Sequence, residues 1–138
     1  MPDEVVLDAS VAAKVFLTGE DGADAAQALI GTSPRKIAPE FVLAELANVA
    51  VTKVRRGDIE RAVGATMAKT SVELFDDLVP ASRLSARAFE LAADHGLSAY
   101  DALYVALAEA RGCPLITADA RLIARIVAAG LTIETRAP

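Results

Sequence analysis

Short apolar runs that end in an acid occur twice in the chain, and a helical pattern follows each of them. The first run is Val5-Val-Leu before Asp8, and the second is Leu115-Ile-Thr-Ala before Asp119. Apolar runs this short predict buried strands rather than helices. The residues that follow, 9–17 and 120–129, have apolar positions spaced as in helices. We therefore expect Asp8 and Asp119 just beyond the C-terminal ends of two strands.

The stretch from residue 98 to residue 119 has the most complete set of helix signals. Ser98 is a typical N-cap, and Asp101 lies three positions later, where an acid completes a capping box. Gly112 and Pro114 predict the end of this helix before the strand at 115–118. Apolar residues recur on one helical face, at Leu103, Ala106, Leu107 and Ala110. This pattern places Asp101 in the first turn of a helix.

The remaining elements alternate along the chain. Further strands are predicted at residues 35–38, 71–75 and 131–134, and further helices at 24–30, 39–51, 58–69 and 80–94. A turn is predicted at 19–22. The alternation predicts a mainly parallel sheet with helices on both faces. No linker, repeat or low-complexity tract divides residues 1–138, so a single domain is expected.

Four acids are expected on the same side of this sheet. Ligands of parallel sheets bind beyond the C-terminal strand ends, and neighbouring strands would start Asp8 and Asp119 about 5 Å apart. Asp101 and Glu45 both lie near helix starts, which belong to that side. Glu45 also stands in a nearly apolar stretch, where burying a lone acid is costly without a partner or a metal. Taken singly, each acid can instead be a helix cap, a first-turn charge or a solvated residue.

Composition indicates an apolar surface that a partner covers. Hydrophobic residues make up 54% of the 138 residues and the mean hydropathy is +0.37, which is high for so short a chain. No apolar run approaches the ~20 residues of a membrane span, and the acidic start lacks the basic region of a signal peptide. Cys113 is the single cysteine, so no internal disulfide can form. We expect a cytoplasmic protein.

The net charge of −5 restricts how the chain could hold a nucleic acid. With 14 basic against 19 acidic residues, an overall basic footprint is missing. Binding would depend on metal ions and on a few local cations. Lys14, soon after Asp8, and Arg121, just after Asp119, are the predicted contacts of a phosphate at the acids. A third group lies farther from the acids and suits the flanking backbone: Lys53, Arg55 and Arg56.

Clustered carboxylates need a cation, or their pKa values rise through mutual repulsion. An all-oxygen set favours Mg²⁺ or Mn²⁺. Such ions activate water and neutralise the charge that develops on a phosphate, so the acids indicate hydrolysis of phosphodiesters. Rival chemistries lack residues: His95 is the one histidine, and the chain has no Gly-x-Ser-x-Gly, Walker A or Gly-x-Gly-x-x-Gly motif.

Four short motifs contain the acids and span nearly the whole chain. They are Val-Val-Leu-Asp8-Ala-Ser10, Pro39…Glu45-Leu-Ala-Asn48, Ala99-Tyr-Asp101-Ala-Leu-Tyr104 and Ile116-Thr-Ala-Asp119-Ala-Arg-Leu. Each motif alone is weak, whereas all four at these spacings are specific. Together they resemble the PIN-domain ribonucleases, in particular the VapC-type toxins of type II toxin–antitoxin pairs.

The resemblance implies a three-layer α/β/α fold around a five-stranded, mainly parallel sheet, with strands one and four adjacent. It implies an endoribonuclease that uses Mg²⁺ or Mn²⁺ to activate water. The implied partners are RNA, a second copy in a homodimer, and a small antitoxin whose tail inserts near the acids. Two groups of site residues are implied: catalytic and metal-binding acids at Asp8, Glu45, Asp101 and Asp119, and supporting residues at Ser10, Thr117 and Asn48.

Other interpretations remain open. A PIN-fold nuclease of RNA processing would have the same acids without being a toxin, and a nuclease-fold protein could act only by binding a partner. A receiver-like Mg²⁺-binding signalling domain needs a second acid after the first strand and a late lysine. Here Asp8-Ala-Ser10 has one acid, and no lysine follows Lys69. A phosphotransferase of the haloacid-dehalogenase type needs Asp-x-Asp at this place, where Ser10 takes the second position.

Overall fold

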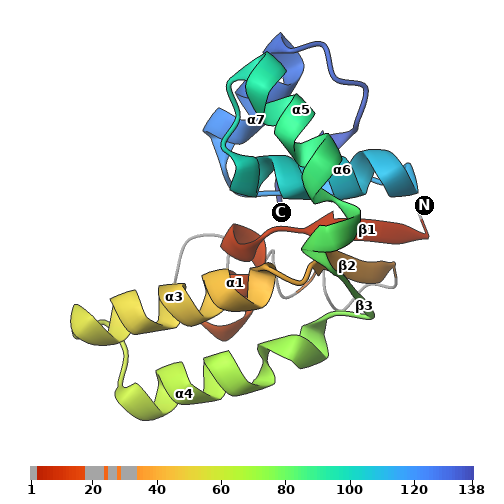
Figure 1. The fold of residues 1–138 in the computed structure, drawn as a ribbon. Coiled ribbons are helices and arrows are strands. Elements are labelled where there is room, and N and C mark those ends of the chain that lie inside the picture. The colour runs from red at the N-terminus through yellow and green to blue at the C-terminus, as the bar shows by residue number, and fades with distance from the viewer. Residues whose placement is uncertain (1–2, 18–23, 25–27, 29–33) are drawn as a thin grey trace.

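A five-stranded sheet forms the centre of the computed structural model, which describes residues 3–17, 24, 28 and 34–138. All neighbouring strands are parallel, in the order β3-β2-β1-β4-β5 (Figure 1). The α/β prediction, with the first and fourth strands adjacent, is therefore confirmed. The strands are β1 (Glu4–Leu7), β2 (Arg35–Pro39), β3 (Asp77–Val79), β4 (Leu115–Ile116) and β5 (Thr135–Arg136).

Helices connect the strands and surround the sheet. The predicted turn at 19–22 and helix at 24–30 lie outside the described residues, apart from positions 24 and 28. In the part of the chain that is described, no helix is both long and apolar enough to cross a membrane. The helices are α1 (Ala9–Phe16), α3 (Val42–Arg55), α4 (Arg61–Thr70), α5 (Ser85–His95), α6 (Ala99–Arg111) and α7 (Ala120–Ala128).

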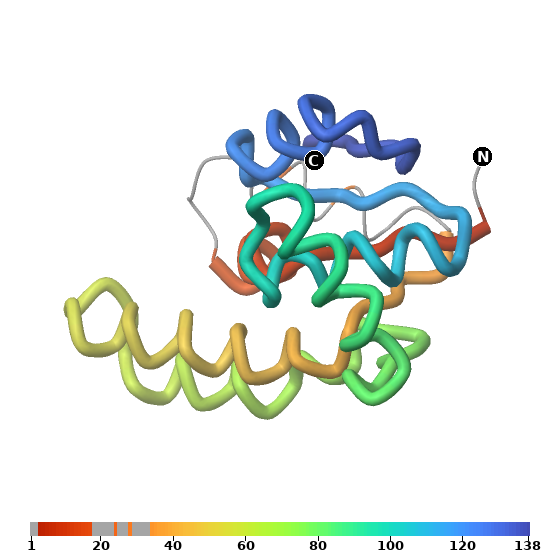
Figure 2. Tube along the Cα trace, turned by 45° about the horizontal axis from the view of Figure 1, so that its top comes forward, coloured from red at the N-terminus to blue at the C-terminus, as the bar shows by residue number. Residues whose placement is uncertain are grey.

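The helices α3 and α4 lie side by side and project from the sheet as a hairpin, as Figure 1 and Figure 2 show. Gly64 permits this close approach, because a Cβ at this position would meet Val54 Cγ2 at 2.8 Å. The hairpin places the N-terminal end of α3, which carries Glu45, next to the sheet. Its far end carries the basic residues that follow position 52.

Both faces of the sheet are apolar. Successive strand residues point to opposite faces, and in β1 the residues on either face are apolar. Val6 and Leu115 belong to the main core together with α6, α5 and α3. The opposite face carries a smaller cluster of Val5, Leu7, Val11 and Ile116. Burial on both faces explains why β1 is almost wholly apolar rather than alternating.

Helix α6 is buried on nearly all sides. The sequence predicted one apolar face, whereas residues 102–108 are all buried, since the sheet packs on one side and α5 on another. The caps are as predicted. Ser98 Oγ accepts a hydrogen bond from the Asp101 N–H at 3.0 Å, and Gly112 ends the helix with a left-handed φ of 61°. These caps fix the position of Asp101 at the start of α6.

The predicted strand at 71–75 is wrong. Ser71–Leu74 is a 3-10 turn that extends α4, and the edge strand β3 comes after it. The Thr70 and Ser71 hydroxyls donate to carbonyls one helical turn earlier, at 2.8 and 3.4 Å, so the chain keeps a helical path here. Alternation over so few residues did not distinguish this turn from a strand.

The last strand is also displaced from its prediction. It lies at Thr135–Arg136 rather than at 131–134. Leu131 and Ile133 pack against the core from an irregular segment, which accounts for the apolar pattern there. The segment still reaches the sheet, because the Leu115 N–H donates to the carbonyl of Glu134 at 2.9 Å.

Candidate active site

Asp8 stands at the junction of β1 and α1, where its carboxylate caps the helix. Its Oδ1 accepts hydrogen bonds from the Val11 N–H at 3.2 Å and from the Ser10 hydroxyl. Its Oδ2 accepts from the Thr117 hydroxyl. Only 6% of Asp8 is exposed, and burial raises its pKa, against hydrogen bonds from Ser10 and Thr117 that lower it. The acid is thus fixed in orientation but incompletely compensated for the loss of water.

Two hydroxyls join the end of β1 to the end of β4. Thr117 is fully buried, and its oxygen accepts from the Asp119 N–H at 3.0 Å while it donates to Asp8. Ser10 Oγ accepts from the Ala118 N–H, also at 3.0 Å. The register Leu7↔Ile116 places these two strand ends side by side. The predicted supporting residues Ser10 and Thr117 therefore lie in direct contact with Asp8.

Asp119 occupies the exposed mouth of the site. Its Oδ1 caps α7 by accepting from the N–H groups of Arg121 and Leu122, at 3.0 and 3.1 Å. Asp119 is exposed at the start of α7. The sequence analysis gave a helix cap as the alternative role of this acid. The cap is compatible with a role in the site, because it engages only one of the two carboxylate oxygens.

Glu45 and Asp101 approach from α3 and α6. Glu45 is half-buried, and Tyr104 of α6 donates its hydroxyl proton to Glu45 Oε1. Burial raises the pKa of Glu45; the Tyr104 hydrogen bond lowers it, and the charges of Asp8 and Asp101 raise it. The pKa of Asp101 is raised by burial first and by Asp119, against Ser98 and Arg125, which lower it.

These mutual effects join the four acids into one electrostatic group. The charges of Asp8 and Asp101 raise the pKa of Glu45, and the charge of Asp119 raises the pKa of Asp101. They come from the ends of β1 and β4 and from the first turns of α3 and α6. All four therefore lie at the C-terminal side of the central strands, where the sequence predicted them.

The chemistry of this group suits a hard divalent cation. Every acid supplies carboxylate oxygens, the ligands that Mg²⁺ and Mn²⁺ prefer, and three of them have pKa values raised by burial. A cation would offset the free-energy cost of keeping these buried carboxylates ionised. Within the described ranges, however, no three Asp, Glu, His or Cys side chains stand close enough to form a ready ligand set. The side chains would have to turn inward to share an ion.

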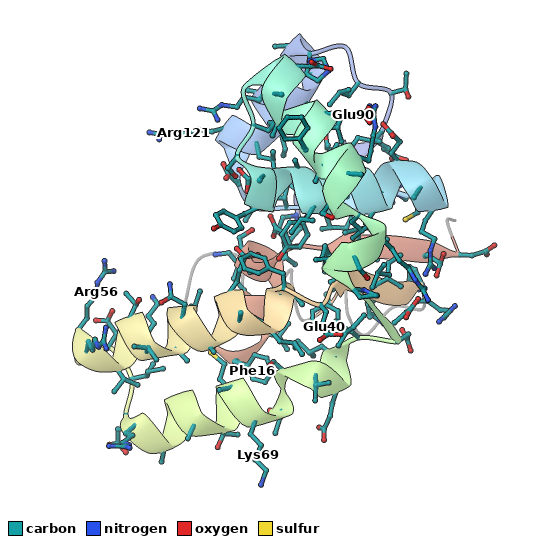
Figure 3. The ribbon with its side chains drawn as sticks, viewed as in Figure 1. Phe16, Glu40, Arg56, Lys69, Glu90 and Arg121 are labelled. Atoms are coloured by element: carbon teal, nitrogen blue, oxygen red, sulfur yellow. The ribbon has the colours of Figure 1, made fainter. Side chains whose placement is uncertain are left out.

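Three other predicted site residues lie on helices that carry or directly follow the acids: Asn48, Lys14 and Arg121. Asn48 is exposed on α3, three positions after Glu45, and Lys14 is half-buried in the last turn of α1. Arg121 is exposed and extends outward from α7, whereas Arg56 lies at the far end of α3 (Figure 3). The structure thus keeps Lys14 and Arg121 on elements that start at the acids, and it places Arg56 at a distance.

Tyr104 is the contact that the sequence analysis missed. It stands within a predicted motif, but nothing there assigned it a role. The available signal was that a tyrosine on a buried helix must find a partner for its hydroxyl. Asp101, three residues earlier on the same helix, indicates the direction in which that partner lies.

Comparison with known proteins agrees with this geometry. The family model of the PIN domain matches residues 5–128, which include all four acids. The chain belongs to the PIN-domain family. A VapC ribonuclease of Mycobacterium bovis is 39% identical over 118 residues, which cover 86% of this chain and 87% of that protein. The resemblance to VapC-type PIN domains is therefore confirmed.

Two solved structures show the same fold. One is from VapBC-5, a member of the VapBC family of toxin–antitoxin systems from Mycobacterium tuberculosis. It is 25% identical, with a TM-score of 0.55, and covers 99% of this PIN domain and 98% of that chain. The other is VapBC2 from Rickettsia felis, in a complex with a DNA fragment from the VapBC2 promoter. It is 13% identical, with a TM-score of 0.70 and 98% coverage of both chains, and shows the fold alone.

Proposed function

We propose that this PIN domain is a Mg²⁺- or Mn²⁺-dependent endoribonuclease of the cytoplasm and the toxin of a toxin–antitoxin pair. The observation that carries the proposal is the group of four mutually repelling acids at one edge of the sheet, in a chain similar to a VapC ribonuclease. The proposed catalytic and metal-binding residues are Asp8, Glu45, Asp101 and Asp119.

A bound cation of this type polarises a phosphate and lowers the pKa of water, which supplies a nucleophile at neutral pH. The chain's own residues determine where such chemistry takes place. Ser10 and Thr117 hold both oxygens of Asp8 in place. Asp119 stands at the exposed side, from which a phosphate can approach. Asn48 lies one turn beyond Glu45 and is proposed as a supporting residue toward bound RNA.

The proposal is tested by incubating purified protein with total RNA and Mg²⁺ or Mn²⁺. We expect discrete cleavage products that disappear with a chelator and return when excess metal is added. Persistent cleavage in the chelator would mean a metal-independent nuclease. No cleavage of any RNA with either ion would contradict the assignment of an enzyme.

Lys14 and Arg121 are proposed as the phosphate contacts, because α1 and α7 both start at the acids. A Lys14→Ala, Arg121→Ala double variant should weaken RNA binding and cleavage by about tenfold, with metal affinity unchanged. Since about two phosphates would lose a contact, the slope of log affinity against log salt should become shallower by about 1.4. Arg61→Ala with Lys69→Ala, which removes two exposed cations of α4, is the matched control. Equal losses in both double variants would contradict the assignment.

The proposed partners are a small antitoxin and a second copy of the chain. The similarity to VapBC-5 supports an antitoxin. Exposed apolar side chains such as Phe89 and Val127 support a further surface that a partner covers. Expression of the chain alone should arrest growth, and co-expression of a cognate antitoxin should relieve the arrest and give a co-purifying complex. Growth without arrest, in the presence of ribonuclease activity, would favour the RNA-processing alternative.

The stability of the metal-free protein should rise on mild acidification. The raised pKa values of Asp8, Glu45 and Asp101 mean that the folded chain holds protons that the unfolded chain has lost. The free-energy cost of burying these charges is fully present above the raised pKa values of the folded chain. It is relieved as pH falls through them toward the unfolded values of 3.8 and 4.5. Thermal unfolding from pH 7.5 to about 5.5 measures this effect.

Excess Mg²⁺ should offset the repulsion and burial of the carboxylate charges at pH 7.5. A concentration of 100 times the dissociation constant would add about 2.7 kcal/mol to the free energy of unfolding. The increase in melting temperature should shrink toward pH 5.5, because protons compete for the carboxylates. A melting temperature that falls continuously on acidification and ignores Mg²⁺ would contradict this account of the site.

A further inference from the structure

A buried tyrosine hydroxyl connects two of the helices that hold the acids. Tyr104 is 2% exposed and belongs to α6, the helix that carries Asp101. Its hydroxyl donates to Glu45 Oε1 on α3. This hydrogen bond therefore joins the first turn of α3 to the helix that carries Asp101.

The direction of this hydrogen bond follows from the two groups that form it. A carboxylate only accepts, and a phenol carries one proton at neutral pH, so Tyr104 donates that proton to Glu45. In the described part of the chain, Tyr104 engages Oε1 of Glu45, and the second carboxylate oxygen is left for another ligand.

We propose that Tyr104 is a positioning residue of the site: it fixes the Glu45 carboxylate relative to Asp8 and Asp101 and leaves one carboxylate oxygen for the cation. The inference rests on the proposed metal-dependent function. Tyr104 touches neither substrate nor cation and acts only through Glu45. A phenylalanine would fill the same space in the core, so the hydroxyl is needed for the carboxylate and not for packing.

The test is Mn²⁺ binding, measured by the electron paramagnetic resonance signal of free Mn²⁺ in a titration of the purified protein. Tyr104→Phe should bind Mn²⁺ about tenfold more weakly or worse, as is typical when a partner that orients a ligand is removed. The matched control is Tyr100→Phe, which removes the same atom from an exposed tyrosine of the same helix. The control should bind Mn²⁺ as the wild type does.

A double-mutant cycle separates positioning from a general structural effect. If Tyr104 acts through Glu45, then Tyr104→Phe should add little to the loss already caused by Glu45→Gln. Additive losses in Mn²⁺ affinity, or wild-type affinity in Tyr104→Phe, would overturn the inference. Failure of the proposed function looks different, because the wild type itself would then bind no Mn²⁺ and cleave no RNA.

A second variant keeps the inference testable if Tyr104→Phe does not fold, which circular dichroism would reveal. Glu45→Asp keeps the negative charge but withdraws it by one methylene from the Tyr104 hydroxyl. We expect weaker Mn²⁺ binding in this variant too. Wild-type affinity in Glu45→Asp would show that the hydrogen bond is not required, and would overturn the inference.

Discussion

Asp8→Asn should remove metal-dependent RNA cleavage while the protein stays folded. Loss of a cation-binding carboxylate forfeits several kcal/mol of charge stabilisation, which corresponds to a fall in rate of at least about a hundredfold. The fold should survive, because asparagine has the same shape. Its amide oxygen can still accept from Ser10 and Val11, and the Thr117 hydroxyl can rotate to accept from its NH₂. Cleavage rates with saturating Mn²⁺ and circular dichroism measure the two outcomes.

The metal-free Asp8→Asn protein should unfold at the same temperature as the wild type or higher. Asp8 is a buried acid whose pKa burial raises, so its charge is a cost that the neutral amide avoids. Asp58→Asn is the matched control, since Asp58 is exposed between α3 and α4, beyond the end of α3 that is opposite Glu45. Full activity of Asp8→Asn, or an equal loss in Asp58→Asn, would contradict the site.

Thr117→Val should disrupt the site by removing the buried hydroxyl that joins Asp8 to Asp119. The fully buried hydroxyl donates to Asp8 and accepts from the Asp119 N–H, so its removal leaves two polar groups without a partner. The free energy of unfolding should fall by about 1–3 kcal/mol, and cleavage should fall by about tenfold or more. Chemical denaturation and cleavage rates measure these effects.

Thr117→Ser is the conservative companion of that variant. It keeps the hydroxyl and removes only a methyl group, so both hydrogen bonds can form. Its cleavage rate should stay close to that of the wild type, with a modest loss of stability. If the valine and serine variants behave alike, the hydroxyl has no role in joining Asp8 to Asp119.

The places of the acids could be predicted because they follow from topology rather than from side-chain detail. Asp8 and Asp119 end short apolar runs, and parallel strands bring such ends to one edge. Ser98 located Asp101 by capping, and the structure has that cap at 3.0 Å. Glu45 stood out as a lone acid among apolar neighbours, and it is half-buried beside α6.

The parts that could not be predicted depend on contacts between distant segments. The partner of Tyr104 lies 59 positions away, and helical spacing carries no information about it. The displaced strands β3 and β5 are two or three residues long, so pairing with a neighbour decides their position rather than local pattern. Residues 102–108 showed one apolar face in sequence, but the burial of their other side depends on how α5 packs.

Anomalous diffraction from crystals grown with Mn²⁺ would locate the cation. We expect an anomalous peak within coordination distance of carboxylate oxygens of Asp8, Glu45, Asp101 and Asp119, with the Glu45 carboxylate held in place by Tyr104. A strong peak elsewhere on the molecule, with none at these acids, would contradict the assignment.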